Sequence, residues 1–161
     1  MKLIILGAGA SGKDYLKKRL KDTKGYTTSV SFTSRKQRAN EVNGVDYHFV
    51  SDETFVDGIN AGRFLEWNKF GNGAYYGTSR ESFEFDGAEL FIMTPSGVRA
   101  LTPEQRRESL VIYLEISEDV RRDRLIKRSD VNDDVERRLG TDREDFKDFT
   151  DYDIKITNPD F

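Results

Sequence analysis

Short apolar runs alternate with amphipathic and polar stretches along most of the chain. Runs of this kind are typical of buried strands, and we predict strands at residues 2–6, 27–32, 90–93, 110–116 and 152–157. Helical spacing or a capping residue predicts helices at residues 14–22, 52–61, 118–128 and 142–149. Strands that alternate with helices predict an α/β fold with a parallel sheet.

Residues 33–88 interrupt this alternation. Residues 33–48 are polar and rich in turn-forming residues, with Asn43-Gly44 as a tight turn, and residues 64–85 alternate aromatic and polar side chains. We therefore predict an inserted subdomain that contains a small antiparallel ribbon. The polar stretch 129–141 is expected to be mobile.

Composition narrows the class of protein. A length of 161 residues suits one domain, and a chain with no cysteine has neither a disulfide framework nor a thiolate metal site. A net charge of -3 argues against a dedicated nucleic-acid binder. No apolar run approaches the roughly 20 residues of a membrane helix, and the first predicted strand follows Met1 directly. We expect a cytoplasmic protein that binds neither membrane nor nucleic acid.

A glycine-rich turn links the first predicted strand to the first predicted helix. Residues 7–13 (GAGASGK) fit the pattern G-x-x-x-x-G-K in the strand–turn–helix context that a phosphate-binding loop requires. Its curled backbone N–H groups and the helix N-terminus form an anion site. The lysine adds positive charge for the β and γ phosphates of ATP. The predicted ATP-binding residues of this loop are Gly7, Gly9, Ala10, Ser11, Gly12, Lys13 and Asp14.

Asp14 departs from the usual loop, in which Ser or Thr follows the lysine and holds Mg²⁺. A carboxylate is a good ligand for Mg²⁺, so Asp14 is our candidate metal ligand. An Asp in the first turn of a helix is also favoured by the helix dipole alone. The sequence leaves both interpretations open.

Residues 34–50 (SRKQRANEVNGVDYHFV) resemble the guanylate kinase family, whose members carry T-R-x-x-R-x-x-E-V-N-G-x-D-Y-x-F-V here. Three further segments match the family in the same order: 64–67 (FLEW), 75–80 (YYGTSR) and 152–158 (YDIKITN). The resemblance implies a nucleoside monophosphate kinase fold with three parts. These are a core (1–32, 89–128 and 142–161), an acceptor-binding insertion (33–88) and a lid (about 129–141).

The resemblance also assigns roles to residues by position. The positions that bind the acceptor nucleotide in the family are occupied here by Ser31, Arg35, Arg38, Tyr47, Glu66, Tyr76, Thr78 and Thr94. Guanidinium groups and phenols suit a monophosphate dianion, and Glu66 matches the glutamate that reads the N1 and N2 edge of guanine. Without the family, Arg35 and Arg38 would be a solvated basic turn.

Basic residues are dense between 121 and 138, and most of them are expected to form a solvated face. Arg128 and Arg138 are exceptions, because they match lid arginines that close on the transferring phosphoryl group. With Lys13 they form the predicted catalytic set. Asn158 matches an asparagine near the adenine of ATP.

The family usually carries D-I-D-x-Q-G at the end of its third core strand, where this chain has IMTPSG at residues 92–97. Ile92 and Thr94 therefore replace two aspartates, one near the metal and one that helps to read guanine. The chain also ends at Phe161, before the helix that usually follows in the family.

The resemblance implies an ATP- and Mg²⁺-dependent kinase that phosphorylates a nucleoside monophosphate, with GMP or dGMP favoured. One alternative is a monophosphate kinase of altered base specificity, which Thr94 supports. A second alternative is a non-catalytic module that captures phosphopeptides, although such modules usually have a degraded phosphate loop. The sequence does not indicate an oligomeric state.

Overall fold

The first of two sheets is fully parallel and is centred on β1 (Lys2–Gly7). The computed structural model describes residues 1–70, 73–85, 87–128 and 134–161. The strand order is β6-β1-β7-β8, with β6 at Leu90–Ile92, β7 at Ser109–Leu114 and β8 at Ile154–Ile156. Every neighbouring pair in this sheet is parallel, which confirms the predicted α/β class.

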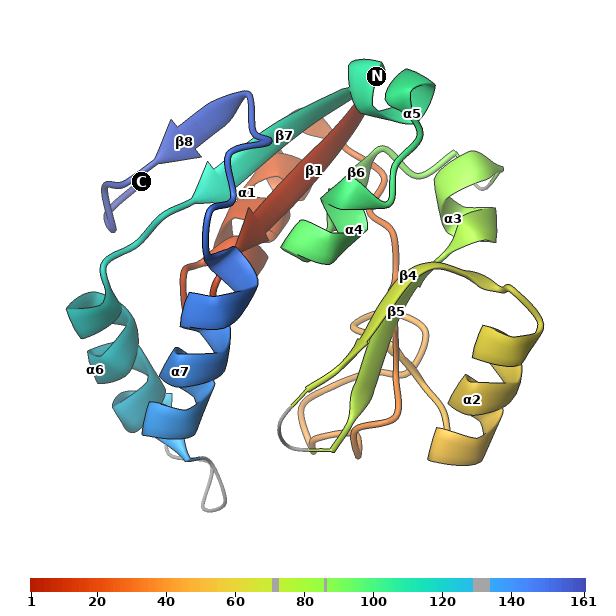
Figure 1. Cartoon of the computed structure of the whole chain (residues 1–161), viewed down its shortest axis with the longest axis horizontal. Helices are drawn as coiled ribbons and strands as arrows, with labels where there is room; N and C mark the ends of the chain where they lie inside the picture. Colours follow the sequence, from red (N-terminus) through yellow and green to blue (C-terminus); the bar gives the residue numbers. More distant parts are fainter. Residues whose placement is uncertain (71–72, 86, 129–133) are drawn as a thin grey trace.

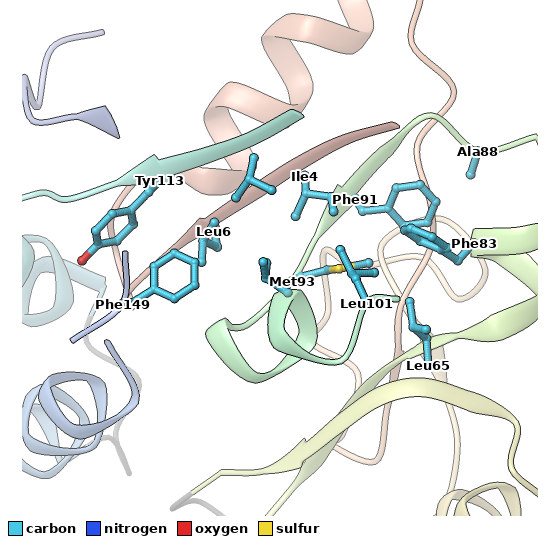
Figure 2. Packing of buried hydrophobic residues seen from close by; sticks show 12 residues of the cluster. Ile4, Leu6, Leu65, Phe83, Ala88, Phe91, Met93, Leu101, Tyr113 and Phe149 are labelled. Atoms are coloured by element: carbon cyan, nitrogen blue, oxygen red, sulfur yellow. The ribbon is translucent and has the colours of Figure 1, made fainter. Parts of the chain in front are cut away.

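Both faces of the parallel sheet are buried, as a run of consecutive apolar residues requires. Leu3 and Ile5 point to one face, where they meet side chains of α1 (Lys13–Lys24). Ile4 and Leu6 point to the other face, into a cluster that also contains Leu65 and reaches the second sheet (Figure 2). This shared core holds the two sheets together.

The second sheet is mixed and lies within residues 32–79. Its strand order is β3-β2-β5-β4, with β3 at His48–Phe49, β2 at Phe32–Thr33, β5 at Tyr75–Ser79 and β4 at Phe64–Lys69. The antiparallel pairing of β4 with β5 confirms the predicted ribbon. Helix α2 (Asp52–Asn60) begins after Ser51, whose hydroxyl accepts the Thr54 N–H, and its Phe55 stacks on Phe64 and Tyr75.

The remaining helices are short, except for two that lie together. They are α3 (Arg80–Glu84), α4 (Pro95–Arg99), α5 (Pro103–Arg107), α6 (Glu118–Arg128) and α7 (Val135–Phe146). Figure 1 shows α6 and α7 on one side of the C-terminal end of β1, with the second sheet and α2 on the other. Within the residues that the structure describes, no helix has the length and apolarity to cross a membrane.

Two predicted elements differ from the structure. Residues 27–32 do not form a full strand of the parallel sheet, because the chain crosses to the second sheet within a few residues: Thr28 bridges Leu90, whereas Phe32 pairs with Gly77. The last long helix begins at Val135 instead of residue 142, and Asp134 caps it by accepting the Arg137 N–H. Within this polar stretch Leu139 is fully buried and anchors the helix.

The predicted lid, about 129–141, is therefore partly helical. Residues 129–133 lie outside the described residues, and residues 135–141 form the first turns of α7.

Candidate active site

The loop between β1 and α1 is tightly curled. Gly12 has a φ of 98° and Ala10 a φ of 62°, both in the left-handed region that favours glycine. At Gly7 the limit is space, because an added Cβ would lie 2.5 Å from the Ser11 Oγ and 2.9 Å from the Leu114 carbonyl oxygen. Backbone geometry thus explains the glycine at position 12, and lack of space explains the glycine at position 7.

Lys13 is the first residue of α1 and bends back over this loop. Its Nζ donates to the carbonyl oxygens of Gly7 at 2.6 Å and Ala8 at 3.1 Å. Burial lowers the pKa of Lys13, and the positive charges of Arg138 and Arg128 lower it further, against the opposing effect of Asp14 and Asp142. The charges of the other two predicted catalytic cations thus act on Lys13, although α1, α6 and α7 supply one each.

Asp14 is exposed in the first turn of α1. Its charge raises the pKa of Lys13 and also contributes, after burial, to the raised pKa of Tyr47 in the second sheet's loop. Asp14 thus lies near both predicted halves of the site. The described residues contain no cluster of three histidine or acidic side chains that could hold a metal. That does not conflict with Mg²⁺, which often takes one or two carboxylates and completes its shell with phosphates and water.

Two arginines of α6 contact the phosphate loop, so the prediction of a solvated face is wrong for them. Arg121 is buried, with 6% of its surface exposed; its Nε donates to the Ile116 carbonyl oxygen at 3.1 Å, and its Nη1 lies 3.5 Å from the Gly9 carbonyl oxygen of the loop. Arg124 donates to the carbonyl oxygens of Ala10 at 3.1 Å and Pro159 at 2.9 Å. The available signal was spacing: Arg124 follows Arg121 by three residues and Arg128 follows Arg124 by four, which places the three arginines on one helix face.

The segment after β8 lies against the phosphate loop. The ring of Phe161 would be 3.0 Å from a Cβ at Gly12, and it packs edge-on against Tyr15 with ring centroids 6.1 Å apart. Asn158 is exposed, and its Oδ1 accepts the Asp160 N–H at 3.0 Å. Asn158 is thereby placed near the loop that it is predicted to serve, through the Pro159 contact with Arg124.

In the segment after β2, Arg35 is held in place by contacts within the protein. Its two terminal nitrogens donate to the two oxygens of Glu41 at 3.0 and 2.7 Å, and its Nε donates to the Tyr76 hydroxyl at 3.2 Å. This bidentate geometry fixes the plane of the guanidinium group. Glu41 was not among the predicted site residues.

Tyr47 and Arg38 belong to the same group of side chains. The Tyr47 ring lies 5.9 Å from the Tyr76 ring and 5.6 Å from the Arg35 guanidinium carbon. Burial, more than any neighbouring charge, raises the pKa of the Tyr47 phenol, so it remains a hydrogen-bond donor at neutral pH. Arg38 is exposed, and its backbone N–H donates to Glu41 at 2.8 Å. Two arginines and two phenols thus gather around one acidic side chain.

Glu66 forms a second acceptor group with two threonine hydroxyls. Thr78 donates to its Oε1 at 2.9 Å and Thr94 donates to its Oε2 at 3.0 Å. Burial raises the pKa of Glu66, and the two hydroxyls oppose that rise. Ser31 directly precedes β2, and its carbonyl oxygen accepts the His48 N–H at 2.9 Å.

Gly97 packs directly against the side chain of Glu66. A Cβ at Gly97 would lie 2.8 Å from the Glu66 Cγ and 3.2 Å from its Oε2, so a larger residue would displace the carboxylate. The Gly97 N–H donates to the Thr94 hydroxyl at 3.1 Å and starts α4. No sequence pattern indicates this close approach, because it joins β4 to a helix about 30 residues later.

Several known proteins similar to this chain belong to the family that its sequence motifs resemble. Residues 1–161 match the family described as Guanylate kinase. A guanylate kinase of Wolinella succinogenes is 48% identical over 83 residues, which cover 51% of this chain and 38% of that protein. A guanylate kinase of Vibrio cholerae is 34% identical over 163 residues, 96% of this chain and 77% of that protein. The crystal structure of guanylate kinase from Anaplasma phagocytophilum superposes with a TM-score of 0.69 at 23% identity, covering 98% of this chain and 76% of that one.

Proposed function

Because this chain belongs to the guanylate kinase family, we propose that it transfers a phosphoryl group from ATP to a guanine nucleoside monophosphate, GMP or dGMP. The observation that carries the proposal is the arrangement around Glu66, a mostly buried carboxylate with one threonine donor on each oxygen. A buried carboxylate held in this way is suited to a ligand with two adjacent N–H donors.

The guanine edge offers that pair of donors at N1 and N2. Each carboxylate oxygen has two lone pairs, and Thr78 and Thr94 use one on each, so one remains on each oxygen for the base. Adenine would present the lone pair of its N1 to the carboxylate, which is repulsive. Glu66 thus favours guanine in two ways: it accepts hydrogen bonds from guanine and repels adenine.

Thr94 acts on the base through Glu66. Its hydroxyl hydrogen goes to Glu66, and its oxygen accepts the Gly97 N–H and lies 2.8 Å from the Ser96 hydroxyl. With these contacts made, Thr94 has no hydrogen-bonding capacity left for guanine. It therefore orients the Glu66 carboxylate. This compensates in part for the absence of the family's aspartate at position 94, which would contact guanine as a second charged group.

The group around Arg35 would bind the acceptor phosphate. Glu41 and Tyr76 fix the Arg35 guanidinium, and Tyr47 and Tyr76 contribute phenol groups next to it. Arg38 adds further positive charge to the same turn. Because Arg35 is already oriented, little side-chain entropy is lost when the monophosphate binds.

The donor half is formed by the phosphate loop and the arginines that approach it. ATP with Mg²⁺ supplies the phosphoryl group when bound, and Asp14 is our candidate side chain toward the metal. The loop N–H groups and Lys13 would cradle the phosphates, and Arg128 and Arg138 would neutralise charge on the transferring group. Asn158 would lie near the adenine. No covalent intermediate is needed, since positioning and charge neutralisation carry such reactions.

We also propose the three-part division into core, acceptor-binding insertion and lid, with closure around the two substrates expelling water during transfer. The dependence on ATP favours a cytoplasmic location.

An assay of ADP release with a panel of nucleoside and deoxynucleoside monophosphates tests the proposal. The highest kcat/KM is expected with GMP or dGMP. A preference for another base would favour a monophosphate kinase of altered specificity. No turnover with any nucleotide, together with binding of phosphopeptides, would favour a non-catalytic module.

A further inference from the structure

A buried ion pair joins α6, α7 and the phosphate loop at a single carboxylate. The Asp142 Oδ2 accepts from the Arg121 Nη1 at 3.1 Å and from the Gly9 backbone N–H at 3.0 Å. The exposed fractions of the two side chains are only 7% for Arg121 and 14% for Asp142. Neither residue is part of the proposed acceptor or catalytic set.

Asp142 shares a helix face with Arg138, one of the proposed catalytic arginines. The two residues are four apart in α7, so their side chains lie one turn apart on the same side. Both cover Gly9: an added Cβ there would lie 3.2 Å from the Asp142 Oδ2 and 3.5 Å from an Arg138 terminal nitrogen. The contact of Asp142 with the loop therefore brings Arg138 to the loop as well.

Stability alone does not account for this buried pair. Removing two charges from water is costly, and buried ion pairs are often no more stabilising than apolar residues of similar volume. The same two helices are already joined at their surface, where Arg143 of α7 donates to Glu118 of α6 at 2.7 Å. What the buried pair adds is the bond to the Gly9 N–H.

The charge of Asp142 also suits this position. Lys13, Arg128 and Arg138 are cations in one neighbourhood, and the two arginines lower the pKa of Lys13. Asp142 raises that pKa and so helps Lys13 to remain protonated. A carboxylate at this point therefore both holds the helix and moderates repulsion among the cations.

We propose that Asp142, held by Arg121, is a positioning residue that fixes α7 on the phosphate loop so that Arg138 lies over the phosphate site. The proposal rests on the proposed kinase function, because Arg138 is its point of action. Asp142 acts through Arg138 and does not itself touch a substrate.

A double-mutant cycle in kcat tests this link. Asp142→Asn, which keeps the side-chain size, is expected to lower kcat about tenfold with the KM for GMP unchanged within about twofold. In an Arg138→Ala background the same substitution should change kcat less than about twofold, because its point of action is gone. Equal losses in both backgrounds would overturn the proposal.

Two further variants distinguish an effect on the position of Arg138 from an effect on the stability of the fold. Arg143→Gln breaks the exposed contact between the same helices and should leave kcat unchanged. The apolar pair Arg121→Met with Asp142→Leu removes both buried charges without leaving either unpaired, so the chain should stay folded. Its kcat should nevertheless fall about as far as that of Asp142→Asn, and a kcat equal to wild type would contradict the proposal.

The same cycle can be measured as the Kd of the non-hydrolysable ATP analogue with a β,γ-imido bridge. Asp142→Asn should weaken binding in the wild-type background but not in Arg138→Ala. A wild-type chain that binds the analogue but phosphorylates no nucleotide would overturn the proposed function, and this Kd cycle would still decide the role of Asp142. Tighter binding by Asp142→Asn would show that the carboxylate opposes the phosphates, against the proposal.

Discussion

The two halves of the candidate site each contain an arginine paired with a carboxylate, but the pairs differ in how they are built. On the acceptor side, Arg35 and Glu41 are six residues apart, within one turn-rich segment. On the donor side, Arg121 and Asp142 are 21 residues apart and come from two helices. The first pair orients an arginine toward a ligand, whereas the second orients a carboxylate toward the protein's own backbone.

This difference separates ligand recognition from assembly of the site. The acceptor pair is local, so a change there should affect one substrate and leave the rest of the molecule intact. The donor pair connects three elements, so a change there should affect the rate of transfer. Substitutions on the two sides should therefore separate substrate binding from the rate of transfer.

Loss of the Lys13 charge should have the largest effect. We expect Lys13→Met to lower kcat at least about a hundredfold, the scale of one lost preorganised electrostatic group. Lys21→Met, on the exposed side of the same helix, is the matched control and should retain the wild-type kcat. Near-normal turnover by a folded Lys13→Met variant would contradict the assignment of the phosphate loop.

Loss of an acceptor arginine should affect one substrate only. Arg35→Ala should cost about 1.5–3 kcal/mol of GMP binding, which raises its KM roughly 10- to 150-fold, with the KM for ATP little changed. Arg38→Ala should act in the same direction. Lys36→Ala, between them and exposed, is the control with a small expected effect. An equal rise in the KM for ATP would show that this turn is not the acceptor site.

On the acceptor side, loss of the Thr94 hydroxyl should weaken the base preference. Thr94→Val removes the hydroxyl that orients Glu66, and the preference for GMP over AMP in kcat/KM should fall by up to about tenfold, roughly 1.4 kcal/mol. Thr94→Ser keeps both the hydroxyl and the helix cap and should behave like wild type. If Val and Ser gave the same base preference, Thr94 would have no role in orienting the carboxylate.

Asp14 should have the mildest effect. If it faces the metal, Asp14→Asn should raise the Mg²⁺ concentration needed for half-maximal rate, because a neutral amide is a weaker ligand than a carboxylate. The measurement is a Mg²⁺ titration at saturating ATP and GMP. An unchanged titration would leave Asp14 as a residue that only favours the start of α1.

The features predicted correctly from the sequence are those that a short, continuous segment determines. The phosphate loop lies between a strand and a helix as its motif requires, and the parallel sheet followed from the apolar runs. Prediction from the sequence failed at residues 27–32, whose chain leaves one sheet for another, and at the start of α7, where the single buried Leu139 anchors an otherwise polar stretch. Neither feature has a periodic signature.

The contacts that the sequence could not predict join distant segments. Asp142 meets Gly9 from 133 residues away, and Gly97 supports Glu66 from another element. An aspartate in a helix and a glycine near a helix start are common, so neither residue type indicates such a contact. The contact arises only when two distant elements pack together. Arg121 looked like part of a solvated charge run until the structure placed it in the interior.

A competition for the γ-phosphate of ATP measures directly which nucleoside monophosphate the protein phosphorylates. The protein is incubated with ATP labelled with ³²P at the γ position and with equal amounts of GMP, AMP, CMP and UMP, and the labelled diphosphates are separated. ADP left over from the donor carries no label, so labelled ADP reports phosphorylated AMP. We predict that GDP carries most of the label and that Lys13→Met gives almost none. More label in ADP or in a pyrimidine diphosphate than in GDP would contradict the role of Glu66 and the proposed function.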